Sequence, residues 1–187
     1  GGLDTVKDVL IGGEGSDAYI IRDLKDTITE KGAGVGNVDT ILLALDYDDN
    51  VKTREVSYTL KNVNIESLIA SNLLDVDGDG YGAKLTGNTK TSTTIVGSDY
   101  KDSIIGGKAL DALLGGGSND TLFGGNDTMA DILQGGNNND TYVLVDTNDV
   151  IVDTNADNNI IQLSKSFKGA GIDLTNQGNF SFQIEKN

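Results

Sequence analysis

The stretch that decides the fold reads Gly115-Gly116-Gly117-Ser118-Asn119-Asp120-Thr121-Leu122-Phe123, and related segments surround it. Residues 106–114 precede it in phase, an eleven-residue variant fills 124–134, and a further nonapeptide begins at Gly135. The most regular copy lies upstream at 12–20 and fits G-G-x-G-x-D-x-U-x, where U is a large apolar residue. Several copies with the glycines, the Asp and the apolar residue in phase predict a repeat structure.

Each fixed position of the nonapeptide has a physical role. The Gly-Gly pair permits positive φ and a sharp turn. The turn directs carbonyl oxygens inward and the Asp adds a carboxylate, which together supply the hard oxygen ligands that calcium prefers. The last three residues form a short strand whose middle side chain faces the interior, because neighbouring residues alternate between faces. The predicted inward-facing residues are Tyr19, Ile104, Leu113, Leu122, Leu133 and Tyr142.

One coil holds two nonapeptides, so turn n stacks on turn n+2 at the same side of the roll. An ion between two stacked turns is then shared by both. The predicted stacked pairs are Asp102 with Asp120, Asp111 with Asp131, and Asp120 with Asp140. Within 124–134, Asp127 and Asp131 compete for the sixth position of the turn.

The predicted calcium ligands are turn glycines, aspartates and one asparagine. They are Asp8, Gly12, Gly13, Gly15, Asp17, Asp26, Asp77, Asp79, Gly97, Asp99, Asp102, Gly106, Gly107, Asp111, Gly115, Gly117, Asp120, Gly124, Asp127, Asp131, Gly135, Asn137, Asp140 and Asp149. Clusters of Gly, Asn and Asp are also ordinary turn sequence. Unrelated hairpins, however, would not keep a nine-residue phase with an apolar residue two positions after each Asp.

Residues 12–32 reappear in diverged form at 135–155, and the pattern continues as 39–42 set against 158–161. Residues 3–11 fit a degenerate copy with Asp8 in the Asp position and no glycines in place. Each duplicated unit begins with a nonapeptide and continues as strand, Asp-x-x-Asp turn and strand. Two interpretations stay open for its remaining acids, which either ligate further ions or lie exposed in turns. These acids are Asp23, Asp26, Glu30, Asp146, Asp149 and Asp153.

The segment 75–80 opens like the calcium loop of an EF-hand, D-x-D-x-D-G. An EF-hand needs an acid at position twelve, where this chain has Thr86, and no helical pattern flanks the loop. A calcium loop at the edge of a coil fits better. Residues 83–96 keep strand patterns without the Asp, so we expect rungs with no ion or a weakly bound one.

The composition restricts the partners. The 187 residues contain 29 acidic and 14 basic side chains, for a net charge of −15. Nucleic acid and anionic membranes are therefore poor partners, whereas multivalent cations are good ones. About five calcium ions would reduce the charge to about −5, at affinities typical of extracellular modules. The chain has no Cys for disulfides, no apolar run that would insert into a membrane, and no signal-peptide pattern at its first residues.

These repeats resemble the RTX (haemolysin-type calcium-binding) family, most closely at 12–20 and 106–143, and 56–68 looks like the inter-repeat segments of long RTX surface proteins. The resemblance implies type I secretion from Gram-negative bacteria, folding on calcium outside the cell, and a carrier role beside other domains of a larger secreted chain. It does not identify a parent protein. Self-association at a surface is a further expectation.

The predicted fold is all-β: a parallel β-roll, a solenoid like a β-helix, with calcium in the turns. Two roll segments are joined by β coils without ligands and followed by a capping tail. The predicted divisions are 1–45, a short roll with cap strands; 46–96, a degenerate β segment; 97–163, the main calcium roll; and 164–187, capping strands.

A structural calcium module of a secreted or cell-surface protein (an adhesin, a surface-layer protein or an exoenzyme) is the leading functional hypothesis. The alternative is a recognition module for a glycan, peptide or ice. Trp is absent and aromatic residues make up 5%, which leaves few platforms for sugar stacking. An enzyme is not expected, because His and Cys are absent and Ser118 lacks the flanking pattern of a nucleophile elbow.

Overall fold

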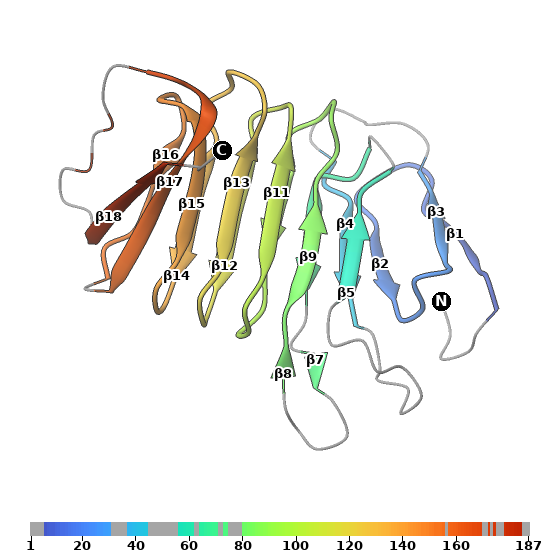
Figure 1. Cartoon of the computed structure of the whole chain (residues 1–187). Coiled ribbons are helices and arrows are strands. Elements are labelled where there is room, and N and C mark those ends of the chain that lie inside the picture. Colours follow the sequence, from blue (N-terminus) through green and yellow to red (C-terminus); the bar gives the residue numbers. More distant parts are fainter. Residues whose placement is uncertain are drawn as a thin grey trace.

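A computed structural model describes residues 6–30, 37–44, 56–61, 64–70, 73–74, 80–155, 157–169, 172, 174 and 178–184. Every regular element in these ranges is a β-strand, and almost all strand pairs are parallel. The strands lie side by side along one axis, from β1 and β2 at one end to β18 at the other (Figure 1). The chain is therefore a parallel β-solenoid, as the repeat predicts.

Two seven-stranded parallel sheets form the walls of the solenoid. Sheet 1 contains, in spatial order, β16 (Val150–Ile151), β14 (Ile132–Gly136), β12 (Ala112–Gly116), β10 (Thr94–Val96), β6 (Ser67–Ala70), β4 (Thr40–Leu43) and β2 (Ala18–Ile21). Sheet 2 contains β18 (Asn179–Ile184), β17 (Asn158–Lys168), β15 (Thr141–Asp146), β13 (Thr121–Gly125), β11 (Ser103–Gly107), β9 (Ala83–Thr86) and β5 (Val56–Thr59).

Two small sheets complete the assigned strands. β1 (Val9–Ile11) pairs in parallel with β3 (Thr27–Thr29). β7 (Leu73–Leu74) pairs with β8 (Gly80–Tyr81) as the antiparallel exception.

The core is a column of apolar side chains between the two sheets. In sheet 2, Leu85, Ile104, Leu122, Tyr142 and Ile161 stand in register on five neighbouring strands. All five side chains are buried. The predicted inward series is confirmed, since Tyr19, Ile104, Leu113, Leu122, Leu133 and Tyr142 are all buried. Buried and less buried residues alternate along these strands, and β2 and β15 each bury a second apolar residue, Ile21 and Leu144.

Sheet 1 runs through the predicted boundaries at 45/46 and 96/97, because β4 pairs with β6 and β10 pairs with β12. The other wall is divided: the β1–β3 sheet ends at β3, and sheet 2 begins at β5. The segment 83–96 contributes β9 and β10 to the two walls, as expected. The division of the chain by calcium occupancy stays a prediction.

The C-terminal segment lies against the last coil. β18 pairs along β17, and the Phe180 ring lies 5.9 Å from the ring of Tyr142. Phe167 also packs on the core, whereas Phe182 is exposed. Phe167 and Phe180 therefore pack on the core at this end, and Phe182 does not.

Candidate metal-binding turns

The turn residue that precedes each strand forms one of two rows along the solenoid. Row 1 precedes the strands of sheet 1 and consists of Asp17, Asp39, Glu66, Thr93, Asp111, Asp131 and Asp149. Row 2 lies at the corresponding places of sheet 2 and contains Asp102, Asp120, Asp140 and Asn159. The strand register thus places acidic side chains one above another at both edges of the core.

Hydrogen bonds join consecutive residues within each row. The Asp102 N–H donates to Asp120 Oδ1 at 2.7 Å, and the Asp120 N–H donates to Asp140 Oδ1 at 2.8 Å. In row 1, the Asp111 N–H donates to Asp131 Oδ1 at 2.7 Å. All three predicted stacked pairs are confirmed. One carboxylate oxygen of each aspartate is therefore used to hold the neighbouring coil in register.

The second carboxylate oxygen is different at three of these aspartates. Asp111, Asp120 and Asp140 are at most 1% exposed. Among the described residues, no group donates a hydrogen bond to the Oδ2 atom of any of the three. An unsatisfied buried carboxylate oxygen is costly, because it has lost its water without gaining a partner. These buried oxygens could therefore hold metal ions.

Burial also changes the acidity of these groups. Loss of water raises the pKa of Asp111 to about 7 and that of Asp120 to about 8, and nearby aspartates add to the increase. The neighbours of Asp120 are Asp102 and Asp140, the two residues stacked on either side of it. A divalent cation would remove both causes, since it solvates the oxygen and neutralises the repulsion.

Glycines make room for these carboxylates. A Cβ on Gly115 would meet Asp120 Oδ2, and a Cβ on Gly135 would meet Asp140 Oδ2. The following glycine, Gly116, has φ +112, and a Cβ there would also meet the carbonyl oxygen of Ser98 in the coil above. The Gly115–Gly116 pair therefore has two functions, since Gly115 leaves room for the carboxylate and Gly116 forms a left-handed turn.

The turn 97–102 satisfies its aspartate in another way. The Ser98 hydroxyl donates to Asp102 Oδ2 at 3.0 Å, and the Ser98 N–H donates to the same oxygen. Asp99, also predicted as a ligand, lies on the exposed side of the turn. Ser98 replaces the second glycine of the motif, which is the sequence signal for this difference.

The turn 87–93 also makes hydrogen bonds of its own. The Asn88 amide donates to Thr93 Oγ1 at 3.3 Å and to Thr91 Oγ1 at 2.6 Å, and Asn88 Oδ1 accepts the Lys90 N–H at 2.8 Å. Row 1 is thus interrupted at Thr93 by a hydrogen-bonded turn that contains no acidic residue. Sequence reasoning missed Asn88, because it lies outside the Asp position of the repeat.

The competition within the eleven-residue variant is resolved by the register. Asp131 is 1% exposed, precedes β14 and accepts the Asp111 N–H, so it occupies the sixth position. Burial raises its pKa to about 6. Asp127 closes the inserted turn, where its Oδ1 accepts the Met129 N–H at 2.7 Å. Its Oδ2 atom is buried, and a Cβ on Gly125 would lie 2.8 Å from that atom.

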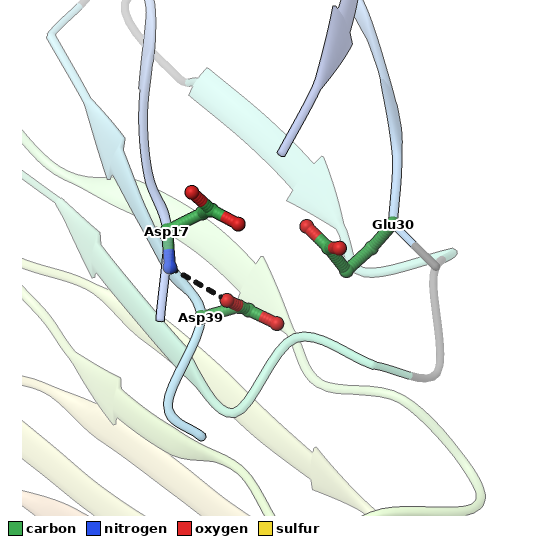
Figure 2. A group of neighbouring side chains, drawn as sticks. All are labelled: Asp17, Glu30 and Asp39. Carbon is green, nitrogen blue, oxygen red and sulfur yellow. Dashed lines mark hydrogen bonds between the residues drawn. The ribbon is translucent and has the colours of Figure 1, made fainter. Parts of the chain in front are cut away.

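A cluster of three acids lies at the N-terminal end. Asp17, Glu30 and Asp39 offer carboxylate oxygens that all lie within 4.8 Å of one another (Figure 2). Asp39 Oδ1 accepts the Asp17 N–H at 2.7 Å. Glu30 is held by the Tyr19 hydroxyl and by the Gly13 N–H. This group of carboxylates is a possible cation site. Sequence reasoning missed Asp39, which precedes β4 as Asp17 precedes β2 but lies outside the nine-residue phase.

A counterpart of this cluster occurs at the C-terminal end. The Tyr142 hydroxyl donates to Asp153 Oδ2 at 2.6 Å, and the Asn159 amide donates to the same oxygen at 2.9 Å. Asn159 Oδ1 accepts the Asp140 N–H at 2.7 Å, as Asp39 does for Asp17. The expected alignment of 39–42 with 158–161 is therefore wrong by one residue, since Asp39 corresponds to Asn159. At the C-terminal end the Asn159 amide donates to Asp153, whereas in the N-terminal cluster a third acid, Asp39, lies beside Glu30.

The other predicted ligands have varied positions. Asp26 Oδ1 accepts the Asp8 N–H at 3.0 Å, and Asp149 Oδ1 accepts the Asp131 N–H at 3.3 Å. Backbone hydrogen bonds join Asn137 to Gly116 and Gly117 to Ser98. The remaining glycines flank the turns and are Gly12, Gly13, Gly15, Gly97, Gly106, Gly107 and Gly124. Asp77 and Asp79 lie outside the described residues.

Comparison of the chain with protein-family models, curated proteins and solved structures finds no match. Among the residues with described structure, no helix has the length and apolar character needed to cross a membrane.

Proposed function

We propose that this chain is a calcium-binding module of the RTX type, a β-roll that folds when calcium enters its turns. The observation that carries the proposal is the recurrence of one buried carboxylate oxygen without a hydrogen-bond partner, at Asp111, Asp120 and Asp140. Carboxylate and carbonyl oxygens are the ligands that calcium takes in proteins. The two stacked rows would hold several ions.

The physical role of calcium follows from the charge and the strand lengths. Most strands have only two to six residues. Such short strands contribute little stability individually, and their ends converge on stacked acids. Without cations, the net charge of −15 opposes compaction. Bound ions would convert the repulsion within each row into attraction, so folding and binding become coupled.

A structural role in a secreted or cell-surface protein is the biological setting that we propose. Calcium at millimolar concentration is an extracellular condition, and sites of this kind are tuned to it. The chain has no Cys, so ions would provide the stabilisation that disulfides give to other exported domains. We propose no catalytic activity for the module.

Far-ultraviolet circular dichroism tests the proposal. The chain should be largely disordered in excess chelator and should gain β-structure at ~1 mM calcium. Magnesium at the same concentration should substitute poorly, because it requires near-octahedral geometry and loses its water reluctantly. A chain that is fully folded in chelator, with no response to calcium, would contradict the proposal.

A further inference from the structure

The first four strands repeat the architecture of β14–β17. β1 pairs with β3 through Val9 and Thr27, and β14 pairs with β16 through Ile132 and Val150, an offset of 123 residues on both strands. β2 pairs with β4 as β15 pairs with β17. We call β1–β4 the N-terminal unit and β14–β17 the C-terminal unit.

The sequence correspondence begins earlier than the strands. Residues 1–11, Gly-Gly-Leu-Asp-Thr-Val-Lys-Asp-Val-Leu-Ile, match the eleven-residue variant at 124–134, Gly-Gly-Asn-Asp-Thr-Met-Ala-Asp-Ile-Leu-Gln. The expectation that residues 3–11 form a nonapeptide without glycines is thereby corrected, because the glycines of this copy are Gly1 and Gly2. Their counterparts, Gly124 and Gly125, are the last two residues of β13.

The two units differ in what lies on their outer side. In the C-terminal unit, β12 pairs with β14 and β13 pairs with β15. In the N-terminal unit, β1 pairs with β3 and β2 pairs with β4, and both are the last strands of their sheets in the described part of the chain. They lie at the outer end of the solenoid (Figure 1).

Burial reflects this difference. Asp140 and Leu133 are 0% exposed in the C-terminal unit, beneath the coil that contains β12 and β13. Their counterparts, Asp17 and Leu10, are only partly buried. The N-terminal unit therefore presents an edge that, in the C-terminal unit, is covered by the coil containing β12 and β13.

We propose, on the basis of the proposed function, that the β1–β2 edge docks a calcium-turn coil of the 106–123 type, in the way that β12 and β13 pair with β14 and β15. The contacts follow from the C-terminal unit. The Thr141 N–H donates to the Asp120 carbonyl at 2.8 Å, and Ala18 is the counterpart of Thr141. The Ala18 N–H therefore donates to the carbonyl of the Asp in the docked turn.

The charge and the apolar contacts fit the same occupant. The docked turn supplies a backbone N–H to Asp17, as Asp120 supplies one to Asp140. Its inward-facing apolar residues cover Leu10 and Tyr19, as Leu113 and Leu122 cover Leu133 and Tyr142. The opposite end of a second copy lacks these features, because β18 has Phe180 in register with Asn159 where a turn would need an Asp.

The experiment adds one coil to the full chain. A copy of residues 106–123 is joined directly before Gly1, which reproduces the spacing that precedes Gly124. In the control chain, the added residues copied from Leu113 and Leu122 are Asp, which cannot pack between the sheets. Hydrogen–deuterium exchange of the Ala18 amide is measured for the unextended, extended and control chains in saturating calcium, and sedimentation gives their oligomeric states.

The proposal predicts that Ala18 exchange slows by about tenfold or more in the extended chain alone, with every chain a monomer. Equal exchange in the extended and control chains would overturn it. So would concentration-dependent protection of Ala18 in the unextended chain with dimer formation, which would identify a second copy as the occupant. A calcium titration of the unextended chain separates these outcomes from a failure of the proposed function, since it reports binding without the added coil.

Discussion

Asp120 is the residue whose removal should weaken calcium binding most clearly, and Asp99 is its control. Asp120 is buried, lies between Asp102 and Asp140 in row 2, and has an Oδ2 atom without a hydrogen-bond partner. Asp99 lies on the exposed side of a turn whose other aspartate, Asp102, is satisfied by Ser98. Each substitution removes one carboxyl group, so a general effect of the acidic composition would be similar for both.

The expected magnitude of Asp120→Ala has two parts. The substitution leaves the buried N–H of Asp102 without its acceptor, which costs about 1–3 kcal/mol of folding free energy. It also removes a charged ligand, and we expect the calcium midpoint to rise by about tenfold or more, where tenfold corresponds to about 1.4 kcal/mol. The Asp99→Ala change should stay within about 0.5 kcal/mol, as for ordinary surface substitutions.

Asp120→Asn separates the two parts. An amide oxygen can accept the N–H of the neighbouring coil, as Asn159 does for Asp140 at 2.7 Å. This variant should keep the hydrogen bond and still lose calcium affinity. Calcium titrations followed by circular dichroism, with urea unfolding at saturating calcium, measure both quantities. Equal effects of Asp120→Ala and Asp99→Ala would refute the assignment of the turns.

Three further predictions concern pH, glycine and the divided wall. In chelator, the calcium-free chain should fold more readily as the pH falls from 8 to 5. The folded-state pKa values of Asp111 and Asp120 are raised to about 7 and about 8, so protonation of these carboxyls stabilises the fold, and this stability is lost as the pH rises through about 7 to 8. Circular dichroism at fixed ionic strength measures the change, and an unchanged or weaker β signal at pH 5 would contradict the prediction. Gly116→Ala should lower the free energy of unfolding by more than about 1 kcal/mol, and by more than Gly117→Ala does, since of these two glycines Gly116 alone combines a positive φ with a close backbone contact. Equal urea midpoints of the two variants would argue against the turn geometry. Limited proteolysis at intermediate calcium should cut first within 46–55, and initial cleavage inside the main roll would contradict the predicted domain division.

The solenoid and its stacked pairs were predictable because each nonapeptide fixes its own geometry. Asp120 lies one coil after Asp102, and Asp140 lies one coil after Asp120, so residues that share a motif position stack. The eleven-residue variant was harder, because an inserted turn leaves two aspartates near the same position. Only the strand register of β14 distinguishes Asp131 from Asp127.

The residues that sequence reasoning missed do not occupy the Asp position of a nonapeptide. Asp39 lies in row 1 at the end of a connection of different length. The alignment of 39–42 with 158–161 displaces its counterpart in the C-terminal unit, Asn159, by one position. Ser98 and Asn88 satisfy their turns through side-chain hydrogen bonds that depend on the local course of the backbone. The motif describes which residues a turn would need to hold an ion. In the turns of Ser98 and Asn88, side-chain hydrogen bonds take the place of such an ion.

The most direct test is a crystal structure grown in millimolar calcium, with anomalous differences used to locate the ions. Our account predicts calcium peaks beside Asp111, Asp120 and Asp140, each about 2.3–2.6 Å from an aspartate Oδ2. The turn that Ser98 closes should have no peak at Asp102. Calcium-free turns at Asp111, Asp120 and Asp140, with water or a protein donor at the Oδ2 atoms, would contradict the central claim.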